Sequence, residues 1–202
     1  IVINYTWQSE DRAIDLLNQI AMNMLLSLPI TKVHFTLINY NKDPWARYLD
    51  KTIDNRIIDV IYEANRVPLL YSTLSKKLED DSDQLGCSLE RKNLEDGAIY
   101  RPYEIIVMSA SDADSRGELM GLFRNGADSG IYFIIMNNTE DQAPHAQGNG
   151  LLSQTPFIHV VDADADCYRD IPLDIVQQAN IFSRYPAWTA SSTKYINDHS
   201  VV

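Results

Sequence analysis

Two serines and two aspartates follow a short apolar run in the middle of the chain, and their oxygen atoms are of the kind that bind divalent cations. The run IIVM, residues 105–108, is typical of a strand in a parallel sheet that is covered on both faces. It is followed by Ser109, Ser111, Asp112 and Asp114. Because open α/β sheets bind ligands at the carboxyl ends of such strands, Asp112 and Asp114 are candidate Mg²⁺ ligands of a hydrolase. No base or nucleophile is evident beside them, so we favour capping of a helix by Asp112.

A second group of acids has carboxylates at every second position, as the start of a calcium-binding loop does. These acids are Asp162, Asp164 and Asp166. The rest of the loop pattern is missing, because Cys167 stands where the loop needs Gly and Leu173 stands where it needs a bidentate Glu. The sequence therefore favours a solvated strand end over a calcium site.

The histidines, cysteines and tryptophans form no catalytic or metal-binding pattern in the sequence. The histidines lack metal-ligand spacing, and no G-x-S-x-G motif is present. The two cysteines are isolated thiols, which is typical of a reducing cytoplasm. We expect the tryptophans to be packing anchors rather than stacking platforms. These residues are His34, His145, His159 and His199; Cys87 and Cys167; and Trp7, Trp45 and Trp188.

The composition indicates one globular domain that does not grip nucleic acid by itself. The chain has 202 residues, of which 45% are hydrophobic and 22% charged, as in ordinary globular domains. Its net charge of −11 argues against an extended phosphate-binding face, because Lys and Arg supply most nucleic-acid affinity. No apolar run approaches the roughly 20 residues of a transmembrane helix. The first residues lack an initiator Met, which we interpret as the start of a piece of a larger protein.

Strands and helices alternate along the chain, which predicts an α/β domain with a mostly parallel sheet and helices on both faces. Apolar and β-branched runs predict strands over residues 1–5, 32–39, 56–62, 103–108, 131–136 and 157–161. Apolar residues at helical spacing predict helices from a cap at Thr6 or Ser9 to about residue 28, over 68–95 with an interruption near Gly86, over 112–125 and over 172–184, with a short helical turn at Pro44.

Two segments lack such periodicity. Residues 137–150 are rich in Asn, Gln, Gly and Pro, which predicts a long loop. Residues 185–202 contain Pro186, paired serines and few periodic apolar positions, which is typical of a linker. We therefore predict one domain over residues 1–184 and a linker or exit segment toward a further domain over residues 185–202.

With its elements in this order, nearly the whole chain resembles the ATPase core of the FtsK/SpoIIIE DNA translocases, a RecA-like three-layer domain. Three stretches carry the resemblance: KVHFTLINYNKDPWARYL at 32–49, RPYEIIVMSASDAD at 101–114 and GADSGIYFIIMNNTEDQ at 126–142. They resemble the strand and turn after the phosphate-loop helix, the Walker B strand, and the strand and loop that sense the γ-phosphate. The chain looks especially like the non-terminal modules of multi-domain members, which carry several such cores in one polypeptide.

The connection that should hold the phosphates departs from the pattern of this family. A phosphate loop reads G-x-x-x-x-G-K-[ST], so that backbone N–H groups wrap the phosphates and the Lys meets the β- and γ-phosphates. Here residues 4–12 read NYTWQSEDR, with neither Gly nor Lys. We expect Trp7 to crowd the backbone approach, while Glu10 and Asp11 add negative charge where phosphate would lie. The sequence therefore predicts that ATP does not bind in the usual mode.

Other positions of the nucleotide site are altered as well. The resemblance places Ser109 and Ala110 where the family has the Mg²⁺-binding Asp and the water-orienting Glu, and Ala cannot transfer a proton. Asn137 and Asn138 remain polar where the sensor strand ends, although turn chemistry explains them equally well. We interpret these positions as a vestigial nucleotide site, made of Thr6, Trp7, Ser9, Ser109, Ala110, Asn137 and Asn138.

These losses favour a non-hydrolysing FtsK/SpoIIIE-like module with a structural or regulatory role in a multi-domain P-loop motor for DNA translocation or segregation. The resemblance implies that its partners are other ATPase domains of the same polypeptide, in a hexameric ring as one arrangement, and that ATP and Mg²⁺ bind only elsewhere in the parent protein. The alternative is a peptide- or partner-binding module of a type VII secretion-like motor, with its pocket around Trp7 and residues 137–150. A Mg²⁺-dependent hydrolase is the third hypothesis. We expect a cytoplasmic location, with membrane association through the parent protein as a variant.

Overall fold

Six strands form one parallel sheet in the computed structural model, which describes residues 1–28, 32–46, 49, 57–97, 101–114, 119–141 and 160–163. The strand order is β3-β2-β4-β5-β1-β6, and each neighbouring pair is parallel. The strands are β1 (Val2–Tyr5), β2 (Val33–Ile38), β3 (Ile58–Ile61), β4 (Tyr103–Ser109), β5 (Ile131–Asn138) and β6 (Val160–Asp162).

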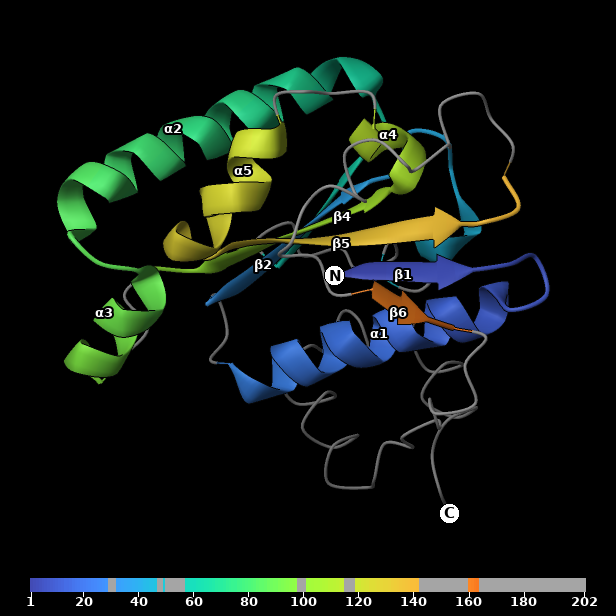
Figure 1. The fold of residues 1–202 in the computed structure, drawn as a ribbon, viewed down its shortest axis with the longest axis horizontal. Helices are drawn as coiled ribbons and strands as arrows, with labels where there is room; N and C mark the ends of the chain where they lie inside the picture. Colours follow the sequence, from blue (N-terminus) through green and yellow to red (C-terminus); the bar gives the residue numbers. More distant parts are fainter. Residues whose placement is uncertain are drawn as a thin grey trace.

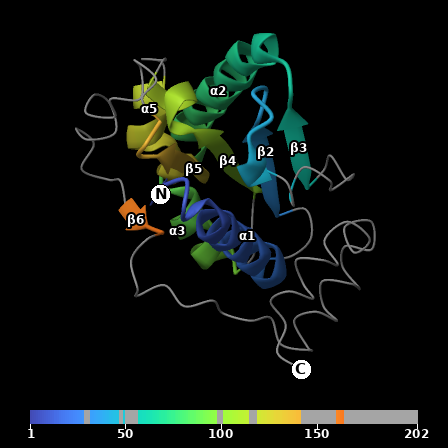
Figure 2. The ribbon, with the colours of Figure 1, turned by 90° about the vertical axis from the view of Figure 1, so that its right-hand side faces the viewer.

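Helices cover both faces of this sheet, so the three-layer α/β prediction is confirmed. In Figures 1 and 2, α1 lies on one face, and α2 and α5 lie on the other. The helices are α1 (Glu10–Ser27), α2 (Val67–Leu85), α3 (Leu89–Asp96), α4 (Ala110–Asp114) and α5 (Leu119–Asn125), with short 3-10 turns η1 (Pro44–Ala46), η2 (Ala64–Arg66) and η3 (Gly126–Ser129). Each βαβ crossover returns the chain to the same edge, which aligns the carboxyl ends of the strands.

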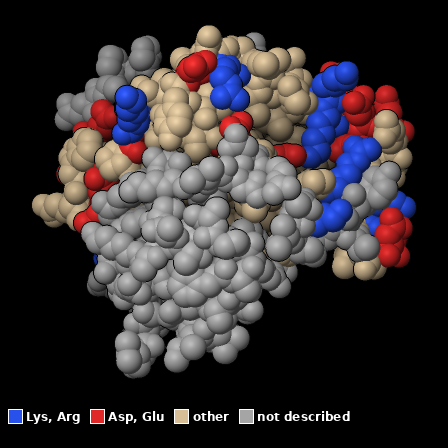
Figure 3. Space-filling model, turned by 180° about the vertical axis from the view of Figure 1, so that it is seen from behind, with Lys and Arg blue, Asp and Glu red and all other residues tan. Residues whose placement is uncertain are grey.

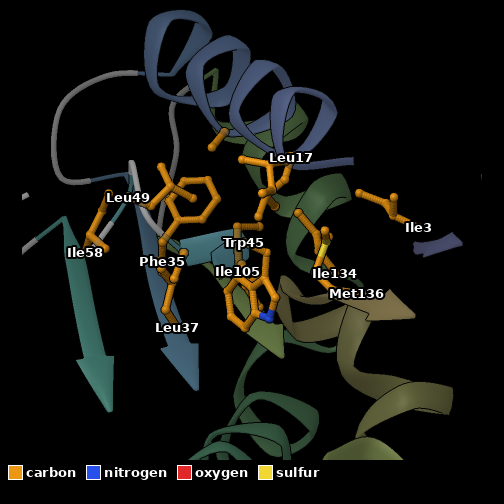
Figure 4. Close-up of a cluster of buried hydrophobic side chains, with 14 of the residues drawn as sticks. Ile3, Leu17, Phe35, Leu37, Trp45, Leu49, Ile58, Ile105, Ile134 and Met136 are labelled. Carbon is orange, nitrogen blue, oxygen red and sulfur yellow. The ribbon is translucent and has the colours of Figure 1, made fainter. Parts of the chain in front are cut away.

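The core is divided between the two faces of the sheet by the alternation of side chains along each strand. In β4, Ile105 and Val107 pack into the cluster under α1, whereas Ile106 and Met108 pack into the cluster under α2 and α5. Figure 4 shows the first cluster, in which Trp45 lies among Leu17, Phe35 and Ile105. The apolar run that we predicted to be buried on both faces is therefore buried in this way.

The structure corrects two predicted boundaries. The predicted helix over 112–125 consists of two helices, and α4 already begins at Ala110, directly after the strand. The loop predicted from residue 137 begins later, because Asn137 and Asn138 continue β5 and pair in register with Asn4 and Tyr5 of β1. The reason is that hydrogen bonds to the neighbouring strand override the turn preference of Asn.

Two other predictions can be compared with the structure. The interruption near Gly86 is confirmed, because Gly86 ends α2 with φ of 62°. The predicted strand over 157–161 lies partly outside the described residues. Four other predicted features lie wholly outside them: the loop over 142–150, the acids at 164 and 166, the helix over 172–184 and the segment 185–202.

Several basic side chains of the described residues take part in ion pairs. Lys and Arg side chains gather in Figure 3 at the end of the molecule that carries α3. There Arg91 and Lys92 pair with acids one helical turn away, and Arg101 pairs with the buried Asp81. In the described parts of the chain, we find no helix with the length and apolar character that crossing a membrane requires.

Candidate functional site

A pocket of about 230 Å³ lies where the carboxyl ends of β1, β4 and β5 meet, and we call it the strand-end pocket. The sheet places β5 between β1 and β4, so segments more than a hundred residues apart converge there (Figure 1). Parallel sheets bind their ligands at this edge. The residues that line the pocket are Tyr5, Trp7 and Glu10; Asn41, Asp43, Pro44 and Trp45; Ser109, Ala110 and Ser111; and Met136, Asn137, Asn138 and Asp141.

Most of the predicted vestigial-site residues line this pocket, and the other two lie beside it. Thr6 and Ser9 belong to the turn between β1 and α1. The Ser9 hydroxyl accepts a hydrogen bond from the Thr6 backbone N–H at 2.9 Å, and the Ser9 N–H donates to the Thr6 carbonyl at 3.1 Å. Ser9 precedes α1, but its side chain makes no capping bond to the helix. Ser9, one of the two predicted caps, therefore hydrogen-bonds Thr6 within the turn instead of the first N–H groups of the helix.

The next N–H of the turn is also occupied. The Trp7 N–H donates to the Glu140 carboxylate with an N···O distance of 2.8 Å. Glu140 lies just after β5, and its own N–H donates to the Asn138 side-chain oxygen at 3.0 Å. A carboxylate of this chain thus binds a backbone donor at the place where a phosphate loop would present its donors to phosphate.

The residues of this turn do not fit a nucleotide phosphate. The Thr6 and Trp7 N–H groups are bound within the protein, and the turn has neither the glycines nor the Lys that phosphate binding needs. The first turn of α1 adds Glu10 and Asp11. Phosphate would therefore meet negative charge and few available donors.

Three partly buried hydroxyl side chains surround the buried Asp112 at the end of β4. The Ser109 hydroxyl donates to Asp112 Oδ2 at 2.8 Å and lies 2.9 Å from the Ser111 hydroxyl. The Tyr40 hydroxyl donates to Asp112 Oδ1. Because Asp112 lies inside α4 rather than before it, the prediction that it caps the helix is wrong.

The same cluster bears on the Mg²⁺ hypothesis. Asp112 is only 5% exposed, and each of its carboxylate oxygens accepts a hydroxyl hydrogen bond. The side chain of Asp114, which also belongs to α4, lies outside the description. No group of three or more His, Cys, Asp and Glu in the described residues is arranged to hold a metal ion. Asp112 therefore serves packing and hydrogen bonding between β4, α4 and the segment after β2.

The two asparagines of β5 have different surroundings. The Asn137 amide donates to the Asn4 side-chain oxygen at 2.7 Å, a bond between two residues that are also paired in register. The Asn138 oxygen accepts from Glu140, but its buried amide nitrogen has no hydrogen-bond partner. The Asn137 side chain thus links β5 to β1, whereas the Asn138 amide N–H groups have no acceptor within the described residues.

The pocket is acidic. Glu10, Asp43 and Asp141 line it, and none of the described lining residues is Lys, Arg or His. Burial raises the pKa of the Asp43 carboxyl, and the charges of Asp112, Asp141 and Glu10 raise it further, against the opposing effect of a hydrogen bond with the Trp45 side chain. Burial and the nearby acids also raise the pKa of the Tyr5 hydroxyl. A negative ligand is disfavoured at such a site, and a positive one is favoured.

Tyr40 and Asp43, which follow β2, were not predicted from the sequence to belong to the site. Glu140 and Asp141, which follow β5, lie in the segment 137–150 that the peptide-binding alternative placed at the pocket, but no role was predicted for either residue. The available signal was a cluster of polar residues directly after each buried strand, in NYNKD and NNTED. Their meeting in one pocket depends on the strand order, which the sequence pattern does not specify.

Comparison with known proteins gives matches in structure alone. No protein-family model matches the chain, and no curated protein matches its sequence. The fold is similar to the cytoplasmic domain of EssC, with a TM-score of 0.56 and 11% identity over 80% of this chain. A weaker likeness, with a TM-score of 0.38, 12% identity and 69% of this chain covered, is to the cytoplasmic domain of the Thermomonospora curvata type VII secretion ATPase EccC.

This chain spans only part of each of these proteins, 32% of the EssC chain and 16% of the EccC chain. At 11% identity, the likeness to EssC concerns the fold and not the site residues. The chain thus has the α/β fold of one segment of the EssC cytoplasmic domain.

Proposed function

We propose that this chain is a non-hydrolysing module of ATPase fold with a structural or regulatory role in a larger multi-domain motor of the FtsK/SpoIIIE type. The observation that carries the proposal is the closed turn before α1, in which Ser9 and Glu140 bind the backbone donors that phosphate would need. The absence of an acid at Ser109 and Ala110 supports it, because neither residue can orient and deprotonate water.

The module's partners are then the other ATPase domains of its polypeptide, which bind ATP and Mg²⁺ in its place. A hexameric ring of such polypeptides is one arrangement. The likeness of the fold to the cytoplasmic domain of EssC supports a cytoplasmic location for the module.

Equilibrium binding of labelled ATP in the presence of Mg²⁺ tests this proposal. We expect no saturable binding up to about 1 mM nucleotide, since the turn offers few of the contacts that give micromolar affinity. Glu140→Gln is an informative variant, because it removes the carboxylate from the Trp7 N–H. Micromolar ATP binding to the unaltered chain, or turnover that is lost in Asp112→Asn, contradicts the proposal.

A second candidate function is binding of a peptide or partner protein in the strand-end pocket. It is favoured by the exposure of Trp7, which is 62% exposed beside an otherwise well-packed site. Large exposed aromatic side chains mark interaction sites more often than plain surface. We do not propose the Mg²⁺-dependent hydrolase, because the Asp112 carboxylate is already bound by Tyr40 and Ser109.

A further inference from the structure

We infer that the strand-end pocket binds the Arg or Lys side chain of a polypeptide segment, with the positive charge beside Asp43 and Glu10 and the indole of Trp7 against its stem. This inference specifies the ligand of the second candidate function, and it rests on the proposal that nucleotide does not take the pocket.

The first step is the charge of the pocket. Asp43 and Glu10 line it together with Asp141, and none of its described lining residues is basic. Lys42 is next to Asp43 in sequence, but it is exposed and does not line the pocket. Burial raises the pKa of Asp43, and the neighbouring acids raise it further, so a cation that enters the pocket would stabilise its charged form.

The second step concerns a hydrogen-bond donor at the pocket. Asn138 lines the pocket, and its buried amide nitrogen has no hydrogen-bond partner. Trp45, which is 1% exposed and also lines the pocket, hydrogen-bonds the Asp43 side chain. Buried donors are costly when unpaired, so the site fits a ligand that brings an acceptor as well as a positive charge.

A polypeptide supplies both groups, because each residue has a backbone carbonyl beside its side chain. A simple metal cation or a polyamine has the charge but no acceptor for the Asn138 amide. The volume of about 230 Å³ is below the range of roughly 300–1,000 Å³ that is usual for small-molecule sites. It therefore fits one long side chain and the adjoining backbone rather than a whole cofactor.

The third step is the position of Trp7. Its backbone is fixed by the bond to Glu140, while its side chain remains 62% exposed and lines the pocket. Indole faces attract Arg and Lys cations and cover their aliphatic stems. The exposed indole is thus placed to cover the stem of a cation that enters the pocket.

The experiment titrates the full chain with the peptide acetyl-Gly-Arg-Gly-amide, using its citrulline analogue as a neutral control of nearly the same shape. The indole N–H resonances of Trp7 and Trp45 in nitrogen-15 NMR spectra report binding. We expect both resonances to shift with the Arg peptide, and about tenfold weaker binding of the citrulline peptide, because charge-assisted hydrogen bonds are lost. Raising the salt concentration should weaken binding of the Arg peptide.

Three variants assign the contacts. Asp43→Asn should weaken binding about tenfold and Trp7→Ala about threefold, whereas Asp80→Asn, which removes an exposed charge from α2, should leave it unchanged. The inference is overturned by absent shifts up to about 10 mM peptide, by equal binding of both peptides, or by an equal effect of Asp80→Asn and Asp43→Asn.

ATP with Mg²⁺, added to the same samples, separates the two proposals. Saturable shifts with ATP contradict the proposed function as well as this inference. Absent shifts with both ATP and peptide contradict only the inference about the ligand.

Discussion

Asp43 connects the chemistry of the strand-end pocket to the stability of the fold. It faces Glu10 on α1, Asp112 on α4 and Asp141 after β5, and burial and these charges together raise its pKa. The folded protein therefore holds the Asp43 proton at a pH where the unfolded chain, with a pKa of about 4, has lost it. Since the folded state then binds more protons, the free energy of unfolding falls as the pH rises through this interval.

Asp43→Asn should remove this destabilising charge. We expect the variant to be more stable than the unaltered chain at pH 7, by about 0.5 kcal/mol, since solvent screens a half-buried carboxylate. Below about pH 3 the carboxyl is mostly protonated in both states, so the advantage should vanish. Urea unfolding at the two pH values measures this, with Asp80→Asn as a control. An advantage that is equal at both pH values would show that charge is not its cause.

At single positions the sequence predicted some roles and missed others. The expectation that the tryptophans are packing anchors is correct for Trp45, which is 1% exposed, and wrong for Trp7, which is 62% exposed. Both follow strands, and the sequence does not show that the segment of Trp45 folds back under α1 whereas the turn of Trp7 is held outward by Glu140. The contact of Tyr40 with Asp112 joins residues 72 positions apart, so it depends on the fold.

At the scale of single elements, two glycines allow a matched comparison of backbone and packing. Gly86 ends α2 with φ of 62°, and Gly130 precedes β5 with φ of 71°. A Cβ atom at Gly86 would meet nothing within 4 Å, whereas one at Gly130 would lie 2.5 Å from the Leu89 side chain and 3.0 Å from the Tyr103 ring. The two positions share the backbone strain and differ in the space available.

We expect Gly86→Ala to cost about 1 kcal/mol of stability, because the left-handed conformation disfavours a Cβ atom. Gly130→Ala should cost about 1–3 kcal/mol more, because the Tyr103 ring and Leu89 must also move. Chemical denaturation of both variants provides the measurement. Equal losses would mean that Leu89 and Tyr103 yield freely and that α3 is loosely attached to the sheet.

The elements themselves were well predicted where apolar periodicity was strong. The strands around β2, β4 and β5, the helix α1 and the interruption at Gly86 follow directly from the spacing of apolar residues and glycine. The end of β5 was predicted too early, because Asn at 137 and 138 suggested a turn while pairing with β1 extends the strand. Boundaries that depend on a neighbouring strand cannot be read from local preference.

At the scale of the whole molecule, the strand order separates the strand-end pocket from most of the core. The pocket is formed by short connections at one edge of the sheet, whereas the two core clusters lie between the sheet and its helices. Replacement of residues in the turn before α1 therefore leaves both core clusters intact. The site can change while the fold keeps its packing.

The charge of the whole molecule gives the last prediction. The net charge of −11 repels phosphates, and in the described residues Arg66, Lys77, Arg91, Lys92 and Arg101 are each paired to an acid. We expect no binding of double-stranded DNA by this chain at about 50 mM salt and about 10 µM protein, conditions under which basic proteins bind DNA non-specifically. Fluorescence anisotropy with a labelled duplex measures this. A salt-dependent affinity would contradict it and would show that basic side chains gather on a face of the chain in spite of its overall charge.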